Sequence, residues 1–274
     1  MAMDISDAFV KQFESEVHMA YQRMGSKLRN TVRNKNNVKG TSTTFQKVGK
    51  GSAGTKSRHG NVPVMSIDHT PVECTLADYY AADYIDKLDE LKINIDERGV
   101  VTQSAAAALG RKTDDLIITQ LDATSNTQSE GGTTGLNQTK VNVVFETMGN
   151  NDIPDDGERY FAISPGGWTD LLGLAAFASA DYVGSDDLPY KGGMVARRWM
   201  GFMFFTHSGL PVATSIRKNF AWHKNCLGHA SGAEVVTELN YIPEKVAHLG
   251  TSYMSQGAVL IDTTGVFEVQ AYDA

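Results

Sequence analysis

Three residues in the C-terminal third of the chain, His223, Cys226 and His229, are of the types that bind zinc. Zinc prefers imidazole and thiolate ligands and takes four of them in structural sites. The surrounding residues predict a strand followed by a turn, and a spacing of three in a strand places side chains on opposite faces. No fourth ligand lies close by in the sequence. We therefore expect no metal at these residues.

A cluster of acidic residues surrounds Gly157: Asp152, Asp155, Asp156 and Glu158. With Gly157 in the sixth place, this spacing resembles a calcium-binding loop. However, Pro154 occupies the third position, and Ile163 occupies the twelfth, where a bidentate glutamate is required. The cluster is better interpreted as a solvated turn.

Residues 49–54 match the G-x-G-x-x-G spacing of dinucleotide-binding loops. That chemistry needs a buried strand before the glycines and, after them, a helix whose N-terminal amides face a pyrophosphate. Here a polar segment precedes them, and Gly60 and Pro63 follow, so a flexible hairpin tip is the better interpretation. The stretch also fails as a P-loop, because one residue too many separates Gly54 from Lys56. We expect no cofactor.

No residue pattern predicts catalysis. Ser208 lacks the first glycine of a nucleophile elbow, and the sequence contains no H-E-x-x-H motif. The carboxylates of 114–115 and of 186–187 are adjacent in sequence and point apart on a helix. Arg197 and Arg198 beside Trp199 suggest phosphate or base contacts, but an arginine pair at a strand edge is the commoner case. We expect no catalytic residue and no enzymatic activity.

The 274 residues, 41% hydrophobic and 21% charged, have the composition of an ordinary folded protein. No window approaches 18 uninterrupted apolar residues, so we expect a soluble intracellular product. The net charge of -7 is unevenly distributed: residues 23–67 carry ten bases and no acid, whereas residues 68–274 carry 28 acids and 14 bases. The basic stretch is a solvated arm, a nucleic-acid contact, or a contact with the acidic body of another copy.

Hydrophobic spacing predicts a helix over residues 4–24, with one apolar stripe: Ile5, Phe9, Phe13, Val17 and Tyr21. Residues 34–63 are poor in large apolar side chains. Because residues 41–48 and 62–76 alternate like strands, an extended hairpin with a Gly/Ser/Lys tip is expected. The helix and the hairpin have no local surface to cover.

The remaining elements predict an α+β fold with segregated parts. The longest helix is expected at 96–123, with Asp96 as its N-cap and Gly110 as its weak point, followed by a linker at 125–138. Further helices are expected at 139–148 and 167–177, and strands at 158–164, 198–208, 220–230, 233–242, 247–261 and 265–272.

The order of these pieces resembles a tailed-bacteriophage major capsid protein of the HK97-like fold. Residues 79–99, YYAADYIDKLDELKINIDERG, resemble the approach to the family's spine helix. Residues 150–172, NNDIPDDGERYFAISPGGWTDLL, are similar to a recurring run in which a strand closes in Ser-Pro before a helix bearing Leu-Leu. Residues 201–211, GFMFFTHSGLP, resemble the next strand and turn.

The resemblance implies a division of the chain into named parts. These are an N-terminal arm (1–37), an extended loop (38–75), a peripheral domain (76–138) with its spine helix (96–123), an axial domain (139–232), a return to the peripheral-domain sheet (233–257) and C-terminal strands (258–274). It further implies pentamers and hexamers that form an icosahedral head around double-stranded DNA. The apolar stripe of residues 4–24 and the loop bases Lys47, Lys50, Lys56 and Arg58 are then candidate inter-subunit contacts.

The implied partners are other copies of the chain, a portal protein, DNA held by non-specific contact and, optionally, a decoration protein, with no membrane. A separate scaffolding protein is implied because only about thirty residues precede the loop. The expected location is the virion, assembled in the host cytoplasm. The alternative is a nucleic-acid-binding protein that uses the basic N-terminal region; a hydrolase with an unrecognised site is a third class. Deletion of residues 1–30 is expected to leave a folded body that assembles poorly.

The interpretation of the zinc-like spacing is testable. Elemental analysis of the purified protein is expected to find no stoichiometric zinc, for the wild type and for His223→Ala alike. One zinc per chain that is lost in His223→Ala would overturn this interpretation.

Overall fold

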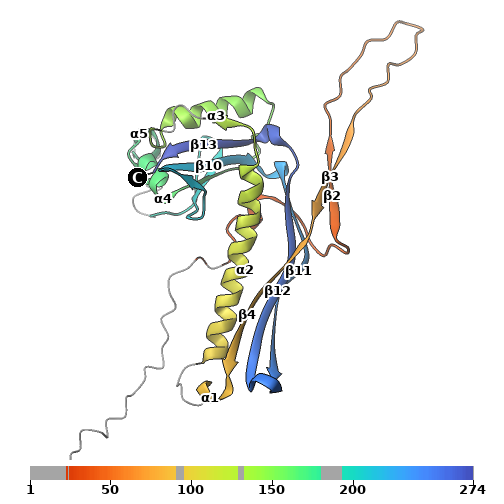
Figure 1. Cartoon of the computed structure of the whole chain (residues 1–274). Helices are drawn as coiled ribbons and strands as arrows, with labels where there is room; N and C mark the ends of the chain where they lie inside the picture. Colours follow the sequence, from red (N-terminus) through yellow and green to blue (C-terminus); the bar gives the residue numbers. More distant parts are fainter. Residues whose placement is uncertain (1–22, 24, 91–95, 129–132, 180–192, 274) are drawn as a thin grey trace, which may run out of the picture. The chain divides into compact units, whose positions relative to one another are not determined.

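The computed structural model describes residues 23, 25–90, 96–128, 133–179 and 193–273. The chain divides into two compact units (Figure 1). The first consists of Met1–Gly25, Asp78–Lys112 and Ala233–Met254, and the second of Ser26–Ala77, Thr113–Gly232 and Ser255–Ala274. Residues 125–138 lie inside the second unit, so the compact units do not divide the chain at the segment expected to be a linker.

The first unit contains nearly all of one strand and parts of two longer ones. The strands β11 (Leu227–Ile242), β12 (Ala247–Leu260) and β4 (Ala77–Asp86) are neighbours in that order. A short 3-10 turn, η4 (Pro243–Lys245), joins β11 to β12, and helix α1 (Lys87–Glu90) follows β4. The sequence did not predict β4, because its acidic and aromatic residues show no clean alternation of apolar and polar positions.

Helix α2 (Glu97–Asp122) confirms the predicted long helix. The carboxylate of Asp96 accepts a hydrogen bond from the Gly99 amide at 3.2 Å and caps the first turn, as expected. Within the first unit, α2 lies close to the strands at a glycine. A Cβ on Gly250 of β12 would lie only 3.3 Å from Cγ1 of Val101 on α2.

Gly110, the expected weak point of α2, has a packing role. A Cβ at this position would lie 2.8 Å from Cα of Gly25, and the neighbouring Arg111 donates a hydrogen bond to the Arg23 carbonyl at 3.5 Å. The glycine therefore lets the incoming chain cross the helix closely, at a cost of about 1 kcal/mol in helix propensity.

The described residues of the second unit form a seven-stranded sheet in the order β5-β13-β10-β6-β8-β7, with β9 also paired to β10. Its strands are β5 (Thr127–Gln128), β6 (Arg159–Ile163), β7 (Arg197–Trp199), β8 (Phe202–Thr206), β9 (Val212–Ala213), β10 (Ile216–His223) and β13 (Val266–Tyr272). Strand β10 is antiparallel to β6 and β13, whereas β6 and β8 are parallel. The strand predicted at 158–164 is therefore confirmed.

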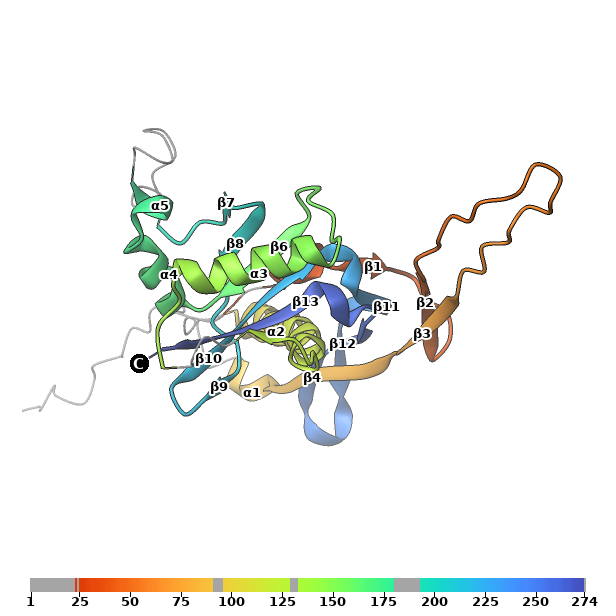
Figure 2. The same cartoon turned by 90° about the horizontal axis from the view of Figure 1, so that it is seen from above.

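Hydrophobic clusters cover both faces of this sheet. One contains helices α3 (Gln138–Asn150), α4 (Pro165–Leu172) and α5 (Ala175–Ala178), which lie on the same side of the sheet (Figures 1 and 2). Its centre is aromatic, with Phe161 and Phe204 stacked at 4.8 Å. The other cluster joins the C-terminal part of α2 to Leu28 and to Trp222 of β10.

Shorter elements complete the second unit. They are η2 (Arg29–Thr31), β1 (Arg33–Lys35), η3 (Lys224–Cys226) and η5 (Thr263–Gly265). Strand β1 runs parallel to residues 228–230 of β11. The indole of Trp222 donates to the Thr31 carbonyl at 3.0 Å, which fixes this part of the chain against the sheet.

Three predicted elements were wrong in detail. The strand expected at 220–230 is interrupted by η3 (Lys224–Cys226), which separates β10 from β11. The strand expected at 198–208 is a hairpin, because Met200 and Gly201 both take positive φ angles, 48° and 77°, and form a two-residue turn between β7 and β8. The helix expected at 167–177 is two helices, since α4 begins at Pro165 behind the Ser164 cap and ends before Gly173.

The buried carboxylate of Asp114 organises the beginning of the second unit. It accepts hydrogen bonds from the Ser26 hydroxyl at 2.6 Å and from the amides of Lys27 and Leu28, both at 3.1 Å. His207, also fully buried, accepts from the Gly209 amide through Nδ1 and donates to Asp114 through Nε2 at 3.0 Å. Residues 26–28 therefore belong to the folded body.

This corrects the expectation that residues 1–30 form a removable segment. Leu28 is completely buried in the cluster under the sheet. Its deletion removes core contacts worth about 2–5 kcal/mol. A deletion meant to leave the body intact must end before Ser26.

The Asp114 network makes stability depend on pH. Burial by itself raises the pKa of Asp114, but the hydrogen bonds from His207, Ser26 and the two amides outweigh it, and the pKa is lowered. Because the pKa of Asp114 is lower in the folded state, its carboxylate stabilises the protein at pH values above the unfolded-state pKa of about 3.9. That stabilisation is lost as the pH falls through the folded-state pKa.

We expect Asp114→Ala to lower the free energy of unfolding by about 3–5 kcal/mol at pH 7, because the buried donors lose their acceptor. Urea unfolding measures this, and the difference from wild type should shrink as the pH falls below about 4. The exposed neighbour Asp115, changed to Ala, is the matched control and should change the value by about 0.5 kcal/mol or less. Equal effects of the two variants would contradict the conclusion that the buried Asp114 carboxylate stabilises the fold.

Candidate inter-subunit surfaces

The predicted extended hairpin is confirmed. Strands β2 (Ser42–Val48) and β3 (His69–Thr75) pair antiparallel, with Ser42 opposite Thr75 and Val48 opposite His69. Beyond this ladder the two chain segments continue side by side to a tip (Figures 1 and 2), and the Gly49 amide donates to the Asp68 carbonyl at 2.8 Å. The stretch 62–68, expected to be a strand, is not one, since β3 begins at His69.

The base of the hairpin packs into the second unit. Phe45 and Cys74 are buried in a small cluster with Ala230 and Ile261. Gly257 of β12 allows this approach, because a Cβ there would collide with the Thr75 carbonyl. The hairpin is thus anchored by its base.

Two of the expected contact lysines have partners within the chain. Lys47 lies 2.9 Å from Asp262, with both side chains about one-third exposed, and Lys50 lies 2.7 Å from Asp152 at the surface. Desolvation raises the pKa of Asp262. The hydrogen bonds from Lys47 and Thr264 lower it by more, so the net pKa lies below its usual value. Lys56 and Arg58 lie exposed in the tip, with no ion pair among the residues that the structure describes.

The tip also carries apolar side chains that sequence reasoning missed. Val62, Val64 and Met65 are 70%, 91% and 49% exposed. Their signal in the sequence is the Val-Pro-Val-Met run at 62–65, which was interpreted as part of a strand. On the opposite segment, a Cβ at Gly51 would collide with Met65 and one at Gly54 with Pro63, so these glycines let the two segments of the tip approach closely.

The expected helix stripe lies outside the described residues. This holds for Ile5, Phe9, Phe13, Val17 and Tyr21, whose role as inter-subunit contacts stays a prediction.

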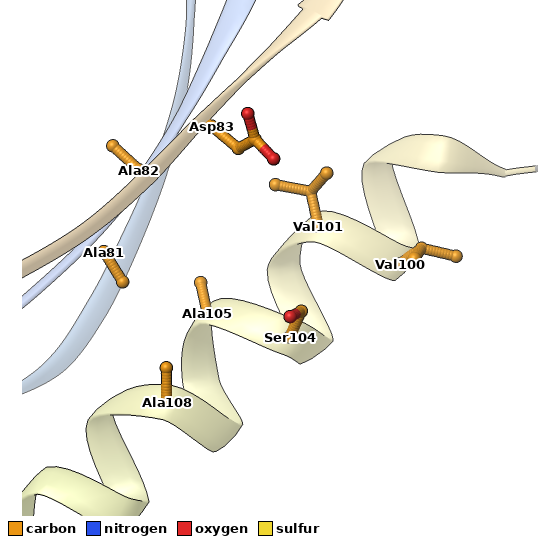
Figure 3. Close-up of a pocket in the computed structure, with 8 residues that line it drawn as sticks. All are labelled: Ala81, Ala82, Asp83, Val100, Val101, Ser104, Ala105 and Ala108. Carbon is orange, nitrogen blue, oxygen red and sulfur yellow. The ribbon is translucent and has the colours of Figure 1, made fainter. Parts of the chain in front are cut away.

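The first unit contains a groove between β4 and α2, with a volume of about 330 Å³. Ala81 and Asp83 on β4 and Val101, Ala105 and Ala108 on α2 point toward one another across it (Figure 3). On the alternate positions of β4, Tyr80 and Tyr84 are 70% and 47% exposed. The described part of this unit therefore presents both a groove and exposed aromatic rings.

The zinc-like residues have separate partners. His223 lies 3.2 Å from Asp156, whereas the ring nitrogens of His229 contact Asn34 and Gln256, each at 3.2 Å. Cys226 is buried, and desolvation raises the pKa of its thiol to about 12. Within the described ranges, no three His, Cys, Asp or Glu side chains gather as metal ligands.

The other candidate motifs also make ordinary structural contacts. Glu158 pairs with Lys224 at 2.5 Å, and Arg198 donates to the Gly157 carbonyl at 3.1 Å. The Arg197 guanidinium lies 5.3 Å from the centre of the Phe177 ring. No helix follows the glycines of 49–54, and among the described residues no helix is long and apolar enough to cross a bilayer.

Comparison with known proteins identifies the architecture. The chain is similar to the capsid of cyanophage P-SCSP1u, with a TM-score of 0.77 and 18% identity over 100% of this chain and 96% of that chain. It is also similar to a structure from Mycobacterium phage Che8, with a TM-score of 0.78 and 13% identity over 96% of this chain and 97% of that chain. For the capsid of cyanophage Pam1 the TM-score is 0.72 and the identity 14%, over 98% of each chain.

These likenesses concern the fold, and they confirm the α+β, HK97-like class expected from the sequence. None of the curated proteins compared with the sequence matches it. A sequence profile described as phage capsid protein matches residues 5–272. Since this covers nearly all 274 residues, the chain belongs to the phage capsid protein family.

Proposed function

We propose that this capsid protein is the major coat protein of a tailed phage, and that its copies assemble as pentamers and hexamers into an icosahedral head around double-stranded DNA. The observation that carries the proposal is the hairpin, whose base is buried while its tip has no core of its own. Such a projecting hairpin does not stabilise an isolated subunit, but it can contact neighbouring copies in an assembly.

The exposed apolar side chains of the tip support contact between copies. Val64 is 91% exposed, and Val62 is 70% exposed beside it. Apolar side chains grouped on a projecting segment mark interaction sites. Covering each one fully would contribute roughly 1.5–3 kcal/mol, repeated for every copy in the shell.

The charge distribution supports the same contact. Residues 49–67 carry Lys50, Lys56 and Arg58 and no acid, whereas residues 78–112 and 233–254 of the first unit carry ten acids and six bases. Opposite charges on two surfaces that meet in an assembly steer association and set register more than they add affinity.

The division of the chain implied by the resemblance is part of this proposal. It assigns residues 1–37 to an arm, 38–75 to the extended loop, 76–138 and 233–257 to a peripheral domain, 139–232 to an axial domain and 258–274 to C-terminal strands. The partners that complete the proposal are a separate scaffolding protein, a portal protein, packaged DNA held non-specifically and, optionally, a decoration protein. Assembly then takes place in the host cytoplasm, and the virion is the final location.

The alternative, a nucleic-acid-binding protein, would use the same bases on phosphates. Lys47 instead pairs with the partly buried Asp262 of its own chain, which makes it less available to a phosphate; the Lys50–Asp152 pair is exposed and does not separate the two functions. Non-specific DNA binding would need these cations free to displace counterions.

Assembly can be tested with the full chain. Negative-stain microscopy and sedimentation, after expression with a scaffolding protein where needed, are expected to find closed shells or rings of many copies. A protein that remains monomeric under every assembly condition and binds DNA would overturn the proposal and favour the alternative.

The tip bases should act between copies. We expect Lys56→Glu with Arg58→Glu to change the stability of unassembled subunits by about 0.5 kcal/mol or less, because both side chains are exposed. The yield of sedimentable shells should fall, most at low salt, since screening weakens surface ion pairs. Lys39→Glu, an exposed base outside the tip, is the matched control.

Lys47 and Lys50 need a different comparison, because each has an acid partner in its own chain. Adding Lys47→Glu and Lys50→Glu to Lys56→Glu should weaken assembly further. The exchange Lys47→Asp with Asp262→Lys rebuilds the internal pair; if it restores the yield, Lys47 acts within its chain. A large loss of subunit stability in the tip variants with normal shell yield would contradict the assignment of the tip to inter-subunit contact.

A further inference from the structure

A row of bases runs along strand β1 and the residues beside it. Among the described strands, β1 pairs only with β11, so its other side is an edge (Figure 2). All three residues of β1 are exposed, and so is Lys39 beyond it. The side chains that we call the basic edge are Arg29, Arg33, Lys35 and Lys39. Four positive charges are thus grouped on one short stretch of the second unit.

Most of these charges are not neutralised by the chain itself. Arg33, Lys35 and Lys39 form no ion pair with the residues that the structure describes. Arg33 lies 5.7 Å from the centre of the Phe45 ring, and Lys35 donates to the Thr44 carbonyl at 3.4 Å. Contacts with a ring and a carbonyl position the side chains without cancelling their charge. Because no acid is close to them in sequence, the basic edge keeps a positive potential.

The basic edge has no apolar side chain to bury against a partner. Leu28 and Val32 are buried, and Val38 is partly buried. Interfaces between proteins have an apolar core, whereas interfaces with DNA are more polar and much more positively charged. Exposed amides add donors of a kind that contacts phosphates: Asn30, Asn36 and Asn37. The composition of this surface therefore favours nucleic acid over a second protein surface.

The same surface lacks the groups that bind unpaired bases. Single strands are held largely by stacking of bases on aromatic side chains, and residues 25–39 contain no aromatic residue. Point charges along an exposed edge instead attract the phosphate backbone, whatever the base sequence. The chemistry of the basic edge thus fits the phosphates of a duplex.

We propose that the basic edge binds the phosphate backbone of double-stranded DNA without reading its sequence. The inference rests on the proposed shell function, which supplies the packaged DNA, and it names the described side chains that contact that DNA. It also divides the bases of residues 23–67 by role. Arg29, Arg33, Lys35 and Lys39 contact DNA, whereas Lys56 and Arg58 of the hairpin tip act between copies.

Duplex binding by the full chain tests the proposal. Fluorescence anisotropy follows a short labelled duplex of arbitrary sequence with unassembled subunits, between about 50 and 200 mM salt. Arg33→Gln with Lys35→Gln removes two charges and keeps much of each side chain. We expect the slope of log affinity against log salt to become shallower by about 2, since each phosphate contact contributes about 0.9. The thermal midpoint and the yield of empty shells should stay at the wild-type values.

Lys56→Gln with Arg58→Gln is the matched control, because it removes the same two residue types from exposed positions. Its salt slope should equal that of the wild type. Equal changes of slope in both double variants, or no binding of the duplex by the wild-type chain, would overturn the inference. Shells formed in normal yield would leave the shell function standing in either case.

Lysine acetylation of assembled heads separates DNA from a neighbouring copy. Lys35 and Lys39 should be protected in DNA-filled heads and reactive in the same heads after the DNA has been released, whereas Lys56 should react equally in both. Protection of Lys35 and Lys39 in emptied heads too would assign the basic edge to another copy and overturn the inference, as would full reactivity in filled heads. Absence of heads altogether would instead count against the shell function.

Discussion

The hydrogen bonds to the buried carboxylate of Asp114 are the interaction on which the order of the second unit depends. One side chain on α2 holds the backbone of residues 26–28, the Ser26 hydroxyl and His207 after strand β8. Parts of the chain far apart in sequence are thereby fixed around one charge. A buried charge is tolerated only when its hydrogen bonds are satisfied, so each of these partners is constrained by the others.

The hairpin shows how glycine positions determine where a limb can attach. Gly257 and Gly228 remove the side chains that would collide with Thr75 and Phe45, so the base of the hairpin lies directly on the strands behind it. In the tip, Gly51 and Gly54 act in the same way, because a Cβ at either position would collide with Met65 or Pro63 of the opposite segment. Glycine thus permits close packing both at the base of the hairpin and in its tip.

Sequence patterns predicted the elements whose own residues determine their structure. Helix α2 and strand β6 appeared at the expected positions because caps and apolar spacing are local signals. The turn at Met200 and Gly201 was missed, since a methionine with positive φ has no local signal and is held there by the pairing of β7 with β8. Of the candidate contact surface, the basic tip could be predicted, but the internal partners of Lys47 and Lys50 depend on residues more than one hundred positions away.

The change in hydrogen bonding along the hairpin affects its susceptibility to proteases. The ladder between β2 and β3 ends at Val48 and His69. The exposed segment beyond it contains Lys50 and Lys56, outside any helix or strand, and Arg58 in a turn. Trypsin cleaves after such residues where the chain can enter its active site, and exposed loop tips are the preferred sites of nicking. A brief digestion should therefore open the loop of a free subunit before it attacks the body, and the surviving fraction of uncut chain would report how far subunits have become covered by their neighbours.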